Sequence, residues 1–176
     1  MRQSIVLAAA IALASPAAAE GQWELGTSGN WSVDLAESDA GGMTCILSSL
    51  NRRKDGLSLL VDSYGDYFLF LATQTDSADP YRTMVADIKF HIYSGDEVEK
   101  WELYDADWAM EDGVISAFFT FGQDPYQRGF VADFMEGGTI TLLNDEGAYA
   151  SWSLDGSVGG VKLLDDCRQM IAGEPL

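Results

Sequence analysis

His91 is the only imidazole in the chain, and nucleophilic hydrolases of the Ser-His-Asp and Cys-His types need an imidazole as general base. Apolar and polar residues alternate over residues 85–93, which predicts a strand with His91 on its polar face beside Lys89 and Tyr93. That position is typical of a surface or rim histidine. Ser157 lacks the Gly-x-Ser-x-Gly spacing of a nucleophile elbow, and helix capping explains it. We therefore predict no catalytic residues and no enzyme activity.

The densest group of carboxylates consists of Asp105, Asp107, Glu111 and Asp112. Calcium prefers such oxygen ligands, but this segment lacks the glycine and glutamate spacing of an EF-hand loop. We predict a solvated loop, with calcium binding as one alternative. Paired carboxylates also hydrolyse glycosidic bonds, so a carboxylate-based glycan hydrolase is a second alternative. One histidine and two distant cysteines cannot fill a zinc site, and we predict no metal site and no cofactor.

Two tryptophans, Trp101 and Trp108, flank this acidic segment. Exposed aromatic side chains stack on sugars or anchor protein partners. We therefore predict a partner-facing patch formed by Trp101, Trp108, Asp105 and Asp107. Core filling is the alternative role for each tryptophan of the chain.

The two cysteines, Cys45 and Cys167, are predicted to form a disulfide, because an even number of cysteines in an exported chain usually pairs. The bridge would close a loop of over 100 residues, which the chain-entropy model values at roughly 4–5 kcal/mol. Two buried free thiols are the alternative. A bridged thiol cannot act as a nucleophile, which argues against a cysteine hydrolase.

The elements that would position these residues are mostly short strands separated by turn residues. Alternation and apolar runs predict strands at residues 31–35, 43–47, 57–61, 67–71, 85–93, 98–103, 114–121, 139–143 and 148–154. The Lys54-Asp55-Gly56 turn predicts a hairpin. A helix is expected to start at Asp124-Pro125 and another at Ser157, the second with a buried stripe of Val161, Leu164, Cys167 or Arg168, and Ile171. The predicted fold is mainly β, a single antiparallel β-sandwich or flattened barrel with two short helices, the C-terminal one disulfide-linked to the sheet.

Residues 1–19 have the form of a secretory signal peptide: Arg2, a short apolar stretch, and small residues at 17–19. The stretch is too short to span a bilayer, which takes about 20 residues. We expect a single domain over residues 20–176, located in the periplasm or secreted, without a membrane span. Losing Arg2 leaves 9 basic residues against 28 acidic ones, a balance that excludes nucleic acid as a partner.

Two segments resemble the invasion-associated locus B family of small exported bacterial proteins. Residues 29–33, followed by Cys45-Ile46-Leu47, resemble the family's opening Trp-x-Val strand and its next, cysteine-bearing strand. Residues 153–157, followed by Leu163-Leu164-Asp165, resemble its closing turn and short helix. Between them, residues 130–143 resemble its helix, glycine turn and strand. Here Asp34 stands where members often have a cysteine, and a mid-chain cysteine pair is absent.

The resemblance implies a β-sandwich-like periplasmic or secreted protein and supplies no catalytic residues. With the absence of a catalytic set, it predicts a non-enzymatic exported protein with a binding or cell-envelope interaction role. The expected partner is an envelope or extracellular protein or glycan.

Overall fold

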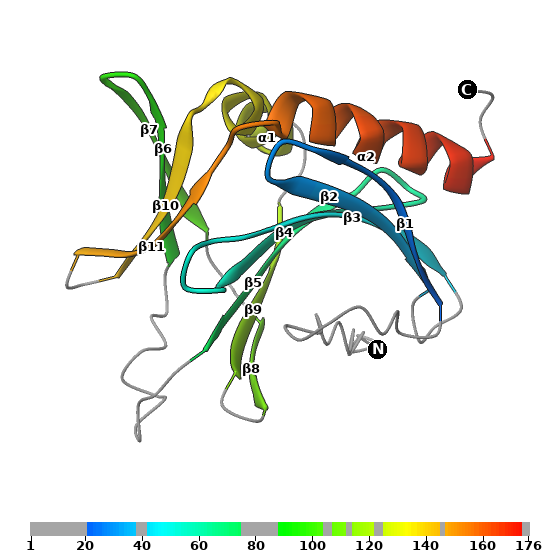
Figure 1. Cartoon of the computed structure of the whole chain (residues 1–176), viewed down its shortest axis with the longest axis horizontal. Helices are drawn as coiled ribbons and strands as arrows, with labels where there is room; N and C mark the ends of the chain where they lie inside the picture. The colour runs from blue at the N-terminus through cyan, green and yellow to red at the C-terminus, as the bar shows by residue number, and fades with distance from the viewer. Residues whose placement is uncertain are drawn as a thin grey trace.

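The computed structural model describes residues 21–37, 42–74, 88–103, 107–111, 114–121, 125–144 and 147–173. These residues form two antiparallel sheets and two helices (Figure 1). The predicted signal peptide at residues 1–19 lies outside the described residues. None of the helices in the described ranges is long and apolar enough to cross a bilayer.

The larger sheet has seven strands in the order β1-β2-β3-β4-β5-β9-β8. Their bounds are β1 Gln22–Ser28, β2 Trp31–Glu37, β3 Met43–Leu50, β4 Gly56–Asp62, β5 Tyr67–Gln74, β8 Asp107–Glu111 and β9 Val114–Thr120. Strands β1 to β5 follow one another in both sequence and space, and the sheet bends strongly (Figure 1). The central strand β4 is buried on both faces, as its nearly continuous apolar sequence requires.

The smaller sheet has four strands in the order β11-β10-β6-β7. These are β6 Ile88–Ser94, β7 Glu97–Leu103, β10 Thr139–Asn144 and β11 Gly147–Ser153. The register between β10 and β11 shifts between Leu142 and Leu143, so Tyr149 is an extra, bulged residue of β11. Strand β11 is an edge of this sheet, and its position next to the larger sheet creates the groove described below.

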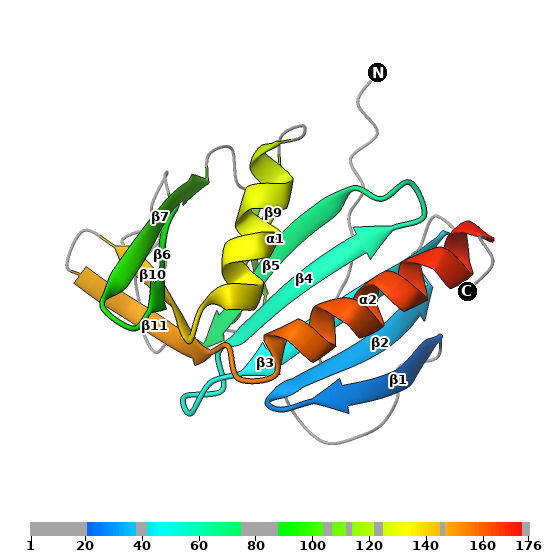
Figure 2. The same cartoon turned by 90° about the horizontal axis from the view of Figure 1, so that it is seen from above.

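Seen from above, both helices lie over the same face of the larger sheet (Figure 2). Helix α2, Ser157–Ala172, crosses β1 to β4 and buries Val161, Leu164 and Cys167, which confirms the predicted stripe. Helix α1, Tyr126–Glu136, contacts β6 and α2 and buries Phe130 and Phe134.

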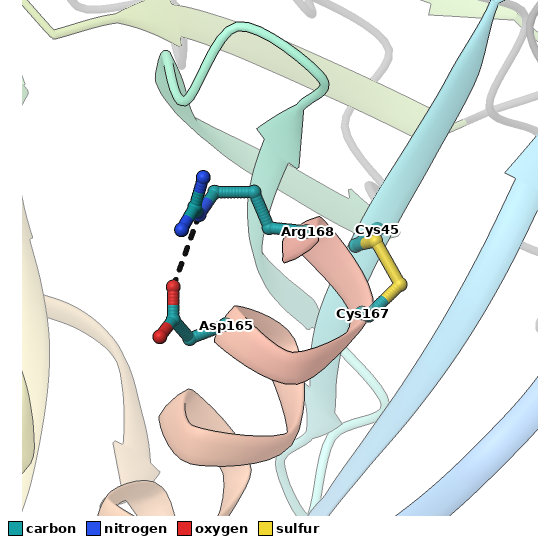
Figure 3. Close-up of a disulfide and its surroundings, with 4 residues drawn as sticks. All are labelled: Cys45, Asp165, Cys167 and Arg168. Atoms are coloured by element: carbon teal, nitrogen blue, oxygen red, sulfur yellow. Dashed lines mark hydrogen bonds and ion pairs between the residues drawn. A yellow bond between two sulfur atoms is a disulfide. The ribbon is translucent and has the colours of Figure 1, made fainter. Parts of the chain in front are cut away.

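The disulfide between Cys45 of β3 and Cys167 of α2 is formed, as predicted (Figure 3). The two Cα atoms are 6.0 Å apart, and 122 residues separate the cysteines in the sequence. Both are buried in the main core beside Leu47 and Leu164. On the same helix, the Arg168 guanidinium pairs with Asp165 at 3.0 Å (Figure 3).

The main core lies between the two sheets and the helices, which confirms the predicted mainly β, sandwich-like fold; over the described ranges the sheets do not close into a barrel. Its largest fully buried side chains include Trp31, Trp152, Phe90 and Phe134. Trp31 and Phe134 meet edge to face with ring centroids 5.0 Å apart. These contacts join the larger sheet to α1.

Several local expectations are wrong. Residues 107–111, expected within a solvated loop, form the edge strand β8, and the strand β1 was not expected from the sequence. Ser157 is not the N-cap of α2: Gly156 holds that position at φ +89°, and the Ser157 hydroxyl donates to the Met135 carbonyl at 3.4 Å. Helix α1 begins at Tyr126 with Pro125 as its N-cap; Asp124, the expected cap, lies outside the described residues.

Candidate functional site

The predicted patch is not brought together on one element. Trp101 lies on β7 and is half-buried, with its ring 4.8 Å from Tyr126 and 5.5 Å from Phe130, measured between centroids. Its indole N–H donates to Asp133 at 2.9 Å. The Trp101 side chain therefore packs against α1, and core filling accounts for most of its surface.

The other patch residues belong to the larger sheet or lie outside the described residues. Asp107 and Trp108 are on β8, where their backbones pair with Phe118 and Ala117 of β9. Asp105 lies outside the described residues. Among the residues that the structure describes, no group of three or more His, Cys, Asp and Glu side chains is placed to hold a metal ion.

His91 lies where the alternation predicts. Its neighbours Phe90 and Ile92 are buried, while His91 is half-buried on the opposite face of β6. The Tyr93 hydroxyl is 3.4 Å from His91 Nδ1. Partial burial lowers the pKa of His91, and the charge of Lys100 on the neighbouring strand lowers it further. His91 is therefore neutral near pH 7.

A groove that the sequence did not predict lies between loop 51–55, which joins β3 to β4, and the edge strand β11. Both views of the fold place this loop beside β11 (Figures 1 and 2). The volume of the groove is about 640 Å³, within the range of about 300–1,000 Å³ that is usual for ligand sites. Its lining is mostly polar and consists of Asn30, Ser49, Leu50, Asn51, Arg52, Arg53, Ala148, Tyr149, Ala150, Ser151 and Ser153. We call it the β11 groove.

Side-chain hydrogen bonds within loop 51–55 stabilise its conformation. The Asn51 carbonyl oxygen Oδ1 accepts hydrogen bonds from the N–H groups of Arg53 (2.9 Å) and Asp55 (3.0 Å). Asn51 Nδ2 donates to the Asp55 carboxylate at 2.9 Å, and Asp55 is only 1% exposed. Lys54 takes a left-handed conformation at φ +66°, so it, and not Gly56, makes the turn of this predicted hairpin.

The same loop is fastened to β11. The Trp152 indole N–H donates to the Asp55 carbonyl at 2.9 Å in the core. Arg53 donates from Nη1 to the Tyr149 carbonyl at 3.0 Å, and its guanidinium lies 5.4 Å from the centre of the Tyr149 ring. Arg53 Nε is 3.7 Å from the Asp55 carboxylate, yet 59% of the arginine side chain is exposed. The arginine is therefore positioned without being buried.

Loop 51–55 is also the main concentration of positive charge. Arg52, Arg53 and Lys54 are three of the chain's 10 basic residues, and they are the only basic residues adjacent in the sequence. All three are exposed. One buried carboxylate, that of Asp55, lies behind them. The β11 groove thus has a positive rim in a protein of net charge −18, and such a rim attracts anionic groups.

The run of three basic residues is visible in the sequence and could have directed attention to this loop. The position of β11 opposite the loop depends on how two sheets pack, which no local pattern encodes. Searches against protein-family models, curated proteins and solved structures find no match to this chain. The site therefore rests on its own geometry.

Proposed function

We propose that this chain is a non-enzymatic exported protein that binds a partner in the cell envelope or outside the cell through the β11 groove. The leader-like residues 1–19 and a disulfide that spans 122 residues support export, since such bridges persist in oxidising compartments. The role agrees with the one implied by the resemblance to the invasion-associated locus B family. Membership of that family is part of the proposal.

The observation that carries the proposal is a groove that has a cationic, internally hydrogen-bonded loop on one side and an edge strand on the other. Arg52 and Arg53 are exposed at its rim, and the Asn51 and Asp55 contacts fix the loop that presents them. Preorganised groups bind with less loss of conformational entropy than mobile ones. The two exposed arginines also make this surface electrostatically different from the rest of an acidic protein, which favours binding of an anionic partner here.

Binding fits the groove better than hydrolysis does. The groove-lining residues include no carboxylate and no imidazole, so this surface, as far as the described residues form it, offers no acid–base pair for glycoside hydrolysis or acyl transfer. Its polar groups are amides, hydroxyls, guanidinium groups and backbone groups, which recognise a ligand without transforming it.

Photo-cross-linking in the envelope of the exporting cell tests the proposal. A photoreactive side chain replaces Leu50, which lines the groove and is 51% exposed; a control position is Val158 on α2, 47% exposed. We expect a discrete adduct from position 50 that disappears in Arg52→Ala/Arg53→Ala. The adduct should persist in Lys100→Ala/Lys162→Ala, which removes the same charge from exposed sites elsewhere. An absence of adduct at position 50, or an adduct that survives the arginine substitutions, would overturn the proposal.

A further inference from the structure

We infer that the β11 groove takes an acidic polypeptide segment in extended conformation, which joins the four-stranded sheet as an additional strand beside β11. This inference rests on the proposed function, because it names the class of ligand for the same groove. Three observations carry it: the direction of the β11 backbone groups, the closure of the edge at both ends, and the position of the arginines.

The backbone groups of β11 alternate between β10 and the groove. The Leu154 N–H donates to the Gly138 carbonyl at 3.0 Å, which fixes the phase of the ladder. Because N–H and C=O groups alternate in direction along a strand, those of Trp152 point to β10 and those of Ser151 and Ser153 point away from it. Within the described part of the chain, β11 pairs only with β10. The outward groups at 151 and 153 therefore face the groove.

The open edge is short because both of its ends are closed. At one end, the bulge at Tyr149 interrupts the ladder and Arg53 binds the Tyr149 carbonyl. At the other end, the Asn30 N–H donates to the Asp155 carbonyl at 3.2 Å, which joins the β1–β2 turn to the residues after β11. Bulges and positive side chains are the usual means of preventing edge-to-edge aggregation. Here they leave a window of a few residues that a short segment can fill.

The arginines select an acidic segment. Arg53 uses Nη1 to hold the Tyr149 carbonyl, and the other N–H groups of its exposed guanidinium can donate charge-assisted hydrogen bonds to a carboxylate of the segment. The remaining acidic surface acts weakly on the bound segment, since the Debye length is about 8 Å at physiological ionic strength.

A polypeptide suits the window better than an anionic polysaccharide does. The outward groups of Ser151 and Ser153 present donors and acceptors at strand spacing, which only another backbone matches in register. Leu50, half-exposed at the groove wall, adds an apolar contact for a side chain on the alternate face of the segment.

The experiment is a calorimetric titration of the full oxidised chain with a synthetic segment of about six residues in which glutamate alternates with threonine or valine. Two derivatives carry backbone N-methyl groups on one or the other alternating set of residues. A third replaces each glutamate with glutamine, and a sulfated dextran is the polysaccharide probe. We expect the acidic segment to bind, one N-methyl set to weaken binding about tenfold or more and the other set to have little effect. The glutamine version should bind about tenfold more weakly, as should Arg52→Ala/Arg53→Ala.

A variant of the strand itself gives an independent readout. Ser151→Pro removes an N–H that faces the groove and is not used by β10, a position where an edge strand tolerates proline. Ser151→Ala is its control, since both substitutions lose the 2.9 Å contact between the Ser151 and Thr141 hydroxyls. We expect proline to abolish binding of the acidic segment and alanine to preserve it, with both melting within a few degrees of each other. If Ser151→Pro does not fold, the comparison of the two N-methyl peptides with the wild-type chain decides whether the segment binds as an added strand.

The outcomes separate the two proposals. If the two N-methyl sets weaken peptide binding equally, strand addition is overturned, while binding of an anionic partner in the β11 groove would still be possible. Arginine-dependent binding of sulfated dextran without binding of the peptide would overturn the polypeptide ligand and leave the proposed function standing. Failure of every probe would overturn the inference, and the cross-link from position 50 would then decide the proposed function by itself.

Discussion

At the scale of single residues, Asp55 determines whether the groove exists in its present form. Its buried carboxylate accepts from Asn51, and its carbonyl accepts from Trp152 on β11. Asp55 therefore stabilises the conformation of loop 51–55 and attaches the loop to β11, while the exposed Arg52 and Arg53 supply the positive charge of the groove. Removal of the Asp55 side chain should damage stability and binding together, whereas removal of the arginines should reduce binding and cost only the exposed contacts of Arg53 with Tyr149 and Asp55.

For Asp55→Ala, we expect the free energy of unfolding to fall by about 1–3 kcal/mol, because the Asn51 amide loses its side-chain acceptor in a partly buried position. Urea unfolding followed by tryptophan fluorescence measures this change. Asp96→Ala, at the exposed β6–β7 turn, is the control and should change stability little. Equal effects of the two substitutions would contradict the anchoring role of Asp55.

A second residue-scale expectation concerns pH. Burial raises the pKa of Asp34, and the carboxylate of Glu24, its register partner on β1, raises it further against an opposing hydrogen bond from Gln22. A raised pKa means that the folded state favours the protonated acid. The stabilising contribution is complete below the ordinary value of 3.8 and is lost as the pH rises through the folded-state pKa.

We therefore expect Asp34→Asn to raise the thermal midpoint near pH 7 and to leave it unchanged near pH 3. Asparagine resembles the neutral acid and removes the repulsion from Glu24. Differential scanning calorimetry at the two pH values provides the measurement. A larger rise of the thermal midpoint near pH 3 than near pH 7 would contradict a raised pKa of Asp34 in the folded state.

Residue types predicted the disulfide and the face on which His91 lies, but they did not predict the β11 groove. The pairing of Cys45 with Cys167 and the outward face of His91 followed from composition and alternation, because both depend on local pattern and on residue counts. The β11 groove did not follow, because it joins Arg53 to a carbonyl 96 positions away. The contacts of the Trp101 ring with Tyr126 and Phe130 of α1 could not be predicted either, and the role of Trp101 in a partner patch stays a prediction.

At the scale of elements, the disulfide fastens α2 across β1 to β4, so its loss should release the C-terminal helix first. We expect Cys45→Ala/Cys167→Ala to lose about 2–5 kcal/mol of stability, as is typical when a native bridge is removed. Guanidinium unfolding with and without reductant measures the difference. Reductant should bring the wild type close to the variant and should leave the variant unchanged; a wild type insensitive to complete reduction would contradict this role.

The turn before α2 carries the sharpest steric requirement. Gly156 has φ +89°, and a Cβ there would overlap the carbonyl of Ser28 in the β1–β2 turn. Gly156→Ala should therefore cost about 2–4 kcal/mol, from left-handed strain plus the clash. Gly95 has φ +62° and no atom within 4 Å of the place that a Cβ would take, so Gly95→Ala should cost only about 1 kcal/mol. Thermal unfolding of both compares them, and equal losses would show that the contact between the two turns is dispensable.

Element boundaries were predicted where periodicity is strong and missed where it is weak. The buried stripe of α2 was predicted correctly, since Val161, Leu164 and Cys167 follow helical spacing. The strand β1 is exposed over most of its length and shows little alternation of apolar and polar residues. Its extended conformation is stabilised by hydrogen bonds to β2, which its own sequence does not reveal. The carboxylates in and around residues 107–111 led to the prediction of a loop, but this segment forms the edge strand β8.

At the scale of the whole molecule, the fold class could be predicted and the strand order could not. Turn residues and alternation indicate many short antiparallel strands, and the chain forms two sheets of them. The insertion of β9 next to β5 and the pairing of β6 with β10 depend on contacts between distant segments. These long-range pairings leave β11 at an edge of the smaller sheet, next to the larger sheet. The arginines of loop 51–55 lie beside this edge and give it positive charge in an acidic protein.

The most direct test of that claim is amide hydrogen exchange of the full oxidised chain, measured with and without a saturating acidic peptide. If the groove binds an extended segment, exchange at the Ser151 and Ser153 amides should slow markedly, while the Trp152 amide, already bonded to β10, should change little. Slowing confined to β7 or β1, or no change along β11 at saturation, would contradict the assignment of the binding surface to the β11 groove.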